Sequence, residues 1–221
     1  MKNFIIALLS TFALATPALA EPEIKEWKTY DAMGCMLLRE CQDGVKEIKT
    51  LEDLQAYYPD IDFSYVANEF DEILFSLRTI GVKVFLAEDK YYPPLHRGVY
   101  HTVGNNFFLN KSYMDKPHQL MSVVRHEGWH VAQDCMAGTI DNNMIAIIHN
   151  EEKVPQYWRD IAEDTYPKYA RPWEQEAMWA GHTLGMTRDA LMVCASRPMW
   201  EVYEPTPLTK EYLINEGYMN D

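Results

Sequence analysis

The chain has 221 residues, of which 48% are hydrophobic and 24% are charged, and its formal net charge at pH 7 is −13. This acidic balance disfavours nucleic acids and anionic membranes as partners, because both carry dense negative charge. Residues 21–221 are enough to bury one hydrophobic core, and no linker, repeat or low-complexity stretch divides them. We therefore expect a single domain there.

Residues 1–20 have the pattern of a secretory signal peptide. Lys2 gives a positively charged start, and the apolar segment from Phe4 to Leu14 is too short to span a bilayer. Ala18-Leu19-Ala20 is a typical cleavage site of the A-x-A form. These features predict a secreted or periplasmic protein without a membrane anchor.

The first part of the mature chain predicts strands and helices in alternation. Residues 27–49 are expected to form a strand pair around the turn Gln42-Asp43-Gly44. Thr50 and Asp53 have the spacing of a capping box, which predicts the start of a short helix. Apolar residues recur at helical spacing over residues 63–79, which indicates a longer helix.

A strand and a hairpin follow that helix. Gly81 is expected to end the helix, and the apolar run over residues 82–86 predicts a strand. Residues 98–103 and 106–109 flank Gly104-Asn105, a dipeptide that favours a tight turn. The sequence therefore predicts a β-hairpin shortly before the next helix.

The most informative run is His126-Glu127-Gly128-Trp129-His130, which has the form H-E-x-x-H. Positions i and i+4 of a helix share one face, so His126 and His130 can direct imidazole nitrogens at the same ion. Zinc accepts nitrogen ligands in tetrahedral geometry. Glu127 projects from the same helix beside the open side of the metal, where it can take a proton from an attacking water.

The sequence around this motif supports the helix that the chemistry requires. The apolar residues that flank the motif are Leu120, Met121, Val123, Val124, Val131 and Ala132. Asp115 is a suitable N-cap, Pro117 is tolerated in the first turn, and Gly138 is a suitable stop. Gly128 costs such a helix about 1 kcal/mol relative to alanine, which indicates either crowding at the site or a tight packing contact.

The C-terminal part of the chain predicts further helices. We expect one near residues 155–164, one from Pro172 to about Leu184, one over residues 188–196 capped by Thr187, and a short last helix capped by Thr209.

The H-E-x-x-H motif followed by a glutamate helix resembles the gluzincins, the zincin metallopeptidases whose third zinc ligand is a glutamate on a later helix. Family motifs show that glutamate as E-x-x-A or E-x-x-A-D, and Glu174 and Ala177 match the shorter form. Met178 stands where the longer form has its aspartate. The resemblance implies Glu174 as the third ligand, with Glu176 as the alternative ligand or as a residue that orients a ligand.

Other acidic residues fit the third position less well. Glu151 and Glu152 lie in a charged stretch that ends at Pro155 and is typical of a loop. Asp134 follows His130 by four residues, but the sequence after His130 lacks the glycine and histidine that the metzincin pattern requires.

The resemblance also implies a fold and two further parts of a site. The fold would be α+β and zincin-like, with a small mixed sheet, a β-hairpin at its edge, and several helices that include the motif helix and the glutamate helix. In zincins an antiparallel edge strand pairs with an extended peptide substrate, and residues 106–110 occupy the corresponding place. Gluzincins also use a histidine or tyrosine as hydrogen-bond donor to the oxyanion. The candidates for that donor are Tyr157, Tyr166, Tyr169, His149 and His182.

Four cysteines, an even number in an exported chain, indicate two disulfides. We favour Cys35–Cys41 together with Cys135–Cys194 among the three pairings, since the second bond would join the motif helix to a helix just past Glu174. The first bond needs a bend, because in a straight strand its two cysteines would lie about 20 Å apart.

Together these features predict an exported zinc metallopeptidase that hydrolyses a peptide or protein substrate. Zn²⁺, its expected cofactor, would be held by His126, His130 and Glu174, and Glu127 would be the general base. Two alternatives use the same scaffold. One is a secreted binding protein without turnover, and the other is a zinc hydrolase that cleaves an amide bond in a non-protein substrate.

Overall fold

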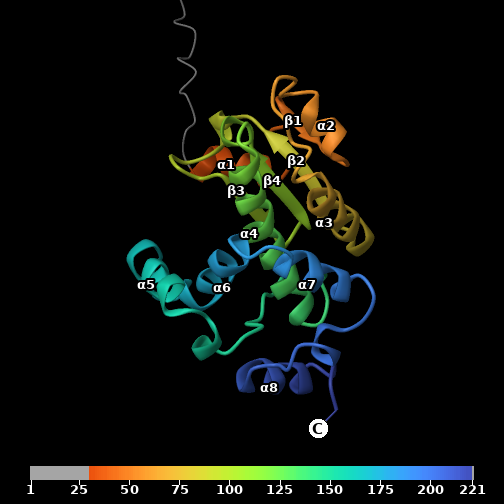
Figure 1. Ribbon diagram of the computed structural model, residues 1–221. Coiled ribbons are helices and arrows are strands. Elements are labelled where there is room, and N and C mark those ends of the chain that lie inside the picture. The colour runs from red at the N-terminus through yellow and green to blue at the C-terminus, as the bar shows by residue number, and fades with distance from the viewer. Residues whose placement is uncertain (1–29, 221) are drawn as a thin grey trace, which may run out of the picture.

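The computed structural model describes residues 30–220 (Figure 1). Over these residues the protein combines eight α-helices with one four-stranded sheet, which confirms the expected α+β class. The expected signal peptide, residues 1–20, lies outside the described residues. Between residues 30 and 220 no helix is long and apolar enough to cross a membrane.

The helices are α1 (Tyr30–Leu37), α2 (Leu51–Gln55), α3 (Ala67–Ile80), α4 (Pro117–Met136), α5 (Gln156–Thr165), α6 (Arg171–Gly181), α7 (Met186–Cys194) and α8 (Pro207–Asn215). The strands are β1 (Val45–Glu47), β2 (Lys83–Ala87), β3 (Gly98–His101) and β4 (Asn106–Asn110).

The sheet has the strand order β1-β2-β4-β3. The predicted hairpin is present as the antiparallel pair β3 and β4, with His101 opposite Asn106. β2 pairs in parallel with β4, so β4 is an inner strand and is buried along its whole length. The expectation that residues 106–110 form the edge strand is therefore wrong, and β3 is the edge.

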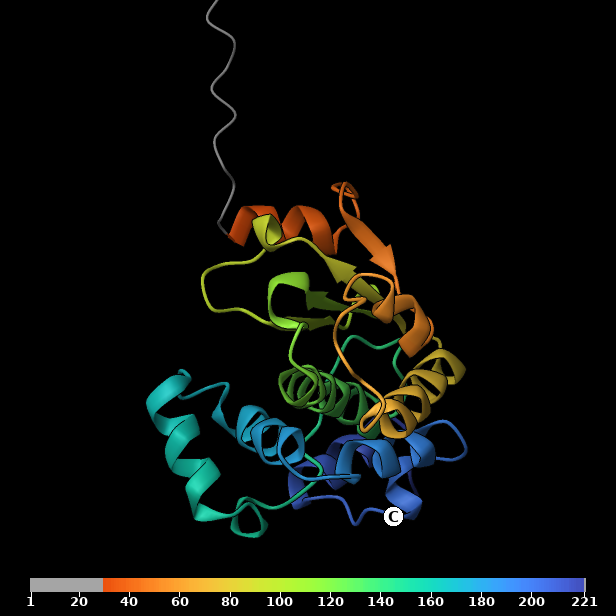
Figure 2. The same cartoon turned by 45° about the horizontal axis from the view of Figure 1, so that its top comes forward.

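Apolar side chains cover both faces of the sheet. Because successive residues of a strand point to opposite faces, Phe107 and Leu109 enter the main core with α3, α4 and α7. Phe108 points the other way and stacks on Phe85, with ring centroids 5.2 Å apart, in a smaller cluster that includes Met36 of α1. Figure 2 shows α4 running beneath the sheet, with α6 and α7 on its other side.

The described part of residues 27–49 does not form the predicted strand pair. Its first segment is helix α1, and only Val45–Glu47 is a strand, which pairs with β2. Met33, Met36 and Leu37 recur at helical spacing and pack on the smaller core cluster. That apolar stripe, and not the moderate turn signal at residues 42–44, determines the local structure.

The start of α2 and the end of α3 follow the sequence closely. The capping box of Thr50 and Asp53 is present at the start of α2. Gly81 ends α3 with a φ of 105°, a left-handed conformation that glycine adopts without strain. α3 begins at Ala67, four residues later than predicted from the periodicity.

Three predicted caps are wrong. Lys116, the residue before Pro117, is the N-cap of α4 in place of Asp115. Gly185 caps α7, because the predicted cap Thr187 lies inside the helix and donates its hydroxyl to Arg125 O at 2.8 Å. Thr206 caps α8 and accepts a hydrogen bond from the backbone of Thr209, the residue predicted for that role.

Both predicted disulfides are present. Cys35–Cys41 and Cys135–Cys194 have Cα–Cα distances of 5.3 and 5.9 Å. The end of helix α1 supplies the bend that the first bond requires. The second bond joins the last turn of α4 to the last turn of α7. Two disulfides indicate an oxidising environment outside the cytosol, as expected for an exported protein.

Candidate metal centre

Three side chains from two helices converge beside the sheet. His126 and His130 lie one turn apart on α4, and Glu174 lies in the first turn of α6. Glu174 Oε2 is 3.3 Å from His126 Nε2 and 3.7 Å from His130 Nε2. One ligand atom from each residue lies within 4.8 Å of the others, so the group has the size of a site for one metal ion.

The chemistry of this group fits a divalent metal. Two imidazole nitrogens and one carboxylate oxygen are a common ligand set of catalytic zinc, which keeps its fourth position open. Glu174 Oε2 is shielded from solvent, and among the described residues its polar neighbours are the two imidazole nitrogens, neither of them in a well-aligned hydrogen bond. A buried carboxylate oxygen costs free energy when it has no partner, and a bound cation would supply one.

The electrostatics of the three residues agree with this arrangement. Burial alone would raise the pKa of Glu174, but the two neighbouring imidazoles lower it well below its usual range. Burial would likewise lower the pKa of His130, but Glu174 and Glu127 raise it to about 9. The group therefore attracts positive charge, whether a proton or a metal ion.

Glu127 lies next to this group and is fixed by the edge strand. Its Oε2 accepts a hydrogen bond from the backbone N–H of Tyr100 in β3 at 3.0 Å. Burial raises the pKa of Glu127, while the charges of His126 and His130 and the Tyr100 N–H act in the opposite direction. Gly98 makes the approach of β3 possible, because a Cβ there would lie 2.9 Å from Glu127 Cγ.

Glu176 points into the interior, away from His126, His130 and Glu174, which together form the candidate metal group. Its carboxylate accepts hydrogen bonds from Trp129 Nε1 at 3.3 Å and from Gln133 Nε2 at 2.8 Å. It also accepts bonds from two backbone N–H groups, those of Ile148 and His149. Of the two glutamates that the sequence left open, the structure therefore brings Glu174 to the histidines and gives Glu176 other partners.

Glycines set how closely the neighbouring helices pack on α4. A Cβ on Gly128 would lie 2.9 Å from Thr187 Cγ2 of α7, so the glycine within the motif serves a tight helix contact. A Cβ on Gly181 of α6 would lie 3.0 Å from the backbone oxygen of Ser122. These two contacts fix the distances of α7 and α6 from the motif helix.

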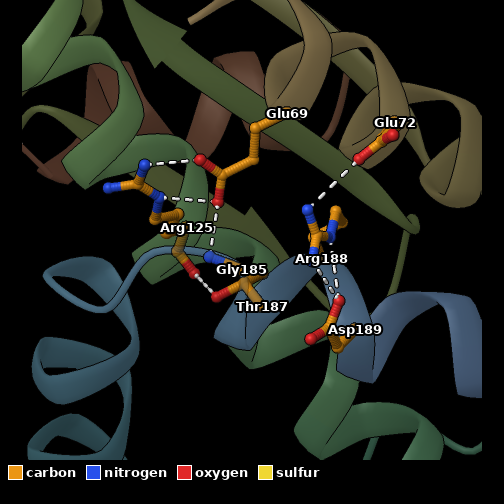
Figure 3. A network of polar contacts seen from close by, with 7 residues as sticks. All are labelled: Glu69, Glu72, Arg125, Gly185, Thr187, Arg188 and Asp189. Carbon is orange, nitrogen blue, oxygen red and sulfur yellow. Dashed lines mark hydrogen bonds and ion pairs between the residues drawn. The ribbon is translucent and has the colours of Figure 1, made fainter.

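A polar network secures α4 at the residue just before the motif (Figure 3). Arg125 donates to the buried carboxylate of Glu69 on α3 through two nitrogens, at 2.9 and 2.5 Å. Glu69 also accepts the N–H of Gly185 at 2.9 Å, at the start of α7. Burial raises the pKa of Glu69, but Arg125 and the Gly185 N–H outweigh it and hold that pKa below its usual value. The network thus joins α3, α4 and α7 behind the metal group.

A cleft of about 820 Å³ opens in front of the metal group. β3 and the segment before it form one wall, from Pro94 to Tyr100, and α4 forms the floor. The opposite wall comes from the end of α5 and from α6, and includes Tyr166, Met178 and His182.

Two of the five predicted oxyanion donors line the cleft. Tyr166 lines it, and its pKa is raised by burial and further by the nearby charges of Glu174 and Glu127. His182 also lines it, but its Nδ1 faces Met178 O at 2.9 Å and its ring stacks on Trp158.

The other predicted donors lie away from the cleft lining. Tyr157 and Tyr169 are exposed outside it. His149 is enclosed by Trp129, Trp179 and Tyr203, and burial lowers its pKa to about 4.

The remaining acidic candidates are not near the metal group. Glu151 and Glu152 are exposed in a short 3-10 turn, as their assignment to a loop predicted. Asp134 is buried and accepts a hydrogen bond from the Tyr100 hydroxyl at 2.7 Å.

Sequence reasoning missed Tyr100 and Gln133. Gln133 Oε1 lies 2.8 Å from His130 Nδ1, and its spacing of three residues from His130 on one helix was a signal for that contact. Tyr100 acts through a backbone N–H, for which the sequence carries no signal.

Comparisons of the chain with protein-family models, with curated proteins and with solved structures find no match. The resemblance to gluzincins therefore depends on the motif residues alone.

Proposed function

We propose that this protein is an exported zinc-dependent peptidase of the gluzincin type. The observation that supports the proposal most strongly is the convergence of His126 Nε2, His130 Nε2 and Glu174 Oε2 within the dimensions of one ion site. A partly buried glutamate that directly follows the first histidine lies beside that group, at the floor of a substrate-sized cleft.

Each residue of the site has a proposed role. His126, His130 and Glu174 would hold zinc, which when bound supplies a Lewis acid that activates water and polarises a carbonyl group. Glu127 Oε2 is held by the Tyr100 N–H, which leaves Oε1 to take a proton from the attacking water. The same carboxyl group would then deliver that proton to the departing amine.

Tyr166 is the donor that fits the developing negative charge on the carbonyl oxygen. It is the tyrosine of the predicted set that lines the cleft, and its raised pKa keeps the hydroxyl protonated at neutral pH. A protonated phenol can donate to an oxyanion, which is the role that such groups have in acyl transfer.

The edge strand β3 fits an extended peptide. Arg97 O accepts a hydrogen bond from Asn110 N, and bonded pairs alternate along an antiparallel ladder. The backbone groups of Gly98 and Tyr100 consequently point to the free edge of the sheet, in agreement with the bond from Tyr100 N to Glu127. Because Glu127 already accepts the Tyr100 N–H, a substrate backbone would add as a further strand through the N–H and carbonyl groups of Gly98 and the carbonyl group of Tyr100.

The test is the substitution Glu127→Gln, compared with Glu152→Gln at an exposed site outside the cleft. Glu127→Gln should retain zinc and the fold but lose at least about 1,000-fold in peptide hydrolysis, because an amide cannot take the proton. Glu152→Gln should match the unmodified protein. Undiminished turnover by Glu127→Gln would refute the mechanism.

The two alternatives predict different results in the same assay. Bound zinc without hydrolysis of any peptide in a broad library, by the unmodified protein, would favour a binding protein on this scaffold. Hydrolysis confined to amides of non-protein substrates, and inhibited by a chelator, would favour the amide hydrolase.

A further inference from the structure

Glu176 is held in the interior by four hydrogen-bond donors. Its side chain is wholly buried, and its Oε2 accepts bonds from Trp129 Nε1 at 3.3 Å, Gln133 Nε2 at 2.8 Å and Ile148 N at 3.3 Å. Its Oε1 accepts the backbone N–H of His149. An ionised carboxyl group can accept four bonds and donates none, whereas an amide at this position would turn two hydrogens toward these donors. The four donors therefore favour a carboxylate at this position, although burial raises the pKa of Glu176.

Glu176 in turn determines the orientation of the Gln133 amide. Gln133 Nε2 donates to Glu176 Oε2 at 2.8 Å and to the backbone oxygen of Trp173 at 3.2 Å. Both amide hydrogens face acceptors in this orientation. The flipped amide would place its oxygen against those two oxygens, which is repulsive. Gln133 must therefore direct Oε1 toward the opposite side.

That side is occupied by His130. Gln133 Oε1 lies 2.8 Å from His130 Nδ1, and a carbonyl oxygen can only accept. His130 must then carry a hydrogen on Nδ1, and in the neutral ring the lone pair is left on Nε2, the atom that faces Glu174. A ligand histidine whose other nitrogen donates to a fixed acceptor presents the correct nitrogen to a metal without rearrangement.

The same pair of residues joins the two helices that carry the ligands. Gln133 belongs to α4, while Glu176 and Trp173 belong to α6 on either side of Glu174. The Gln133 backbone oxygen also accepts Ala146 N at 2.8 Å, next to Ile145 in the wall of the cleft.

We propose that the buried pair Gln133–Glu176 is the positioning device of the metal centre: it fixes His130 in the Nδ1–H form and holds α4 and α6 at the spacing that brings Glu174 to the histidines. This inference depends on the proposed metal site for its purpose, but the ring state of His130 can be measured without any metal. Neither residue lines the cleft, so both would act through His130.

The test uses Glu176→Gln, with Glu152→Gln as the control for the same chemical change. Glu152 is exposed and lies outside both the cleft and the candidate metal group. A second variant, Gln133→Met, keeps the length of the side chain and removes the acceptor. It covers the case in which Glu176→Gln does not fold.

The first readout is ¹⁵N NMR of the histidine rings, in the metal-free protein at a pH high enough to leave His130 neutral. The unmodified protein and Glu152→Gln should show the Nδ1–H form of His130 alone. Glu176→Gln and Gln133→Met should show a mixture of the two neutral forms. The second readout is the dissociation constant for zinc, which should rise roughly 10- to 100-fold in these two variants but not in Glu152→Gln.

The outcomes separate this inference from the proposed function. An Nδ1–H form that persists in both Glu176→Gln and Gln133→Met, with unchanged zinc affinity, would overturn the inference and leave the peptidase proposal intact. A fixed Nδ1–H form in the unmodified protein that is lost in the variants would support the inference even if zinc bound weakly and no peptide were cleaved.

Discussion

Asp134 carries a carboxyl group into the core one turn beyond His130 on α4. Burial raises its pKa from 3.8 to about 7, although the hydrogen bond from the Tyr100 hydroxyl acts in the opposite direction. Its Oδ1 is buried and accepts no hydrogen bond from the described residues. The folded protein thus retains a proton on Asp134 at pH values where the unfolded chain has released it.

The sign of the resulting pH dependence follows from linkage. Between about pH 4 and pH 7 the folded state binds more protons at this residue than the unfolded state, so the free energy of unfolding falls as the pH rises. The loss is complete above pH 7 and amounts to up to roughly 4 kcal/mol. Asp134→Asn should remove this component and flatten the profile measured by urea unfolding between pH 4.5 and 8. Parallel profiles for the variant and for the unmodified protein would contradict the assignment.

The sequence pattern predicts the histidine pair but does not decide between Glu174 and Glu176 as the third ligand. The histidines and Glu127 were predictable because their spacing alone defines a helix face. Two residues that are two positions apart on a helix point in nearly opposite directions, at about 200°. Which of them meets the histidines depends on the rotation of α6 about its axis. The contact of Gly181 with Ser122 limits that rotation, and no local sequence signal reports it.

The hairpin of β3 and β4 was predictable from the sequence, but its position in the sheet was not. The Gly104-Asn105 turn and its apolar flanks predict two paired strands, whatever the position of that pair in the sheet. Which strand is the edge depends on the parallel pairing of β2 with β4, which joins segments on either side of β3 in the sequence. The consequence for function is direct, since β3 supplies both the free edge and the N–H that holds Glu127.

Gly98 is the position at which β3 can be tested. A Cβ there would lie 2.6 Å from Val123 Cγ1 and 2.9 Å from Glu127 Cγ, so Gly98→Ala must displace the strand or Glu127, the proposed general base. We expect turnover to fall roughly 10- to 100-fold with zinc content unchanged, because misplacement of a catalytic group by a fraction of an ångström is costly. Gly34→Ala is the control, since a Cβ on Gly34 meets nothing within 4 Å. Equal turnover for the two variants would show that the contact does not position Glu127.

At the scale of the whole molecule, α4 joins the sheet to the helical part. It packs on β3 and β4 on one side and on α6 and α7 on the other (Figure 2). The disulfide Cys135–Cys194 ties its last turn to α7 over a sequence separation of 59 residues. The pairing was predictable from cysteine number and helix order, whereas the helical form of residues 30–37 was hidden by a competing turn signal.

The two disulfides should contribute unequally to stability. Loop-closure entropy gives about 4 kcal/mol for Cys135–Cys194 and about 2 kcal/mol for Cys35–Cys41, which closes only six residues. Replacing each pair by alanine and measuring urea unfolding should reproduce this order. A larger loss from the Cys35–Cys41 pair would mean that the long loop is already restrained in the unfolded chain.

The zinc content of the purified protein tests whether His126, His130 and Glu174 hold one zinc ion together. After dialysis against metal-free buffer, the unmodified protein should retain about one zinc ion per chain, and Glu174→Gln should retain far less while unfolding at a similar urea concentration. Glu152→Gln should retain as much as the unmodified protein. An unmodified protein that binds no zinc after zinc is added, or a Glu174→Gln variant that retains it fully, would contradict the account.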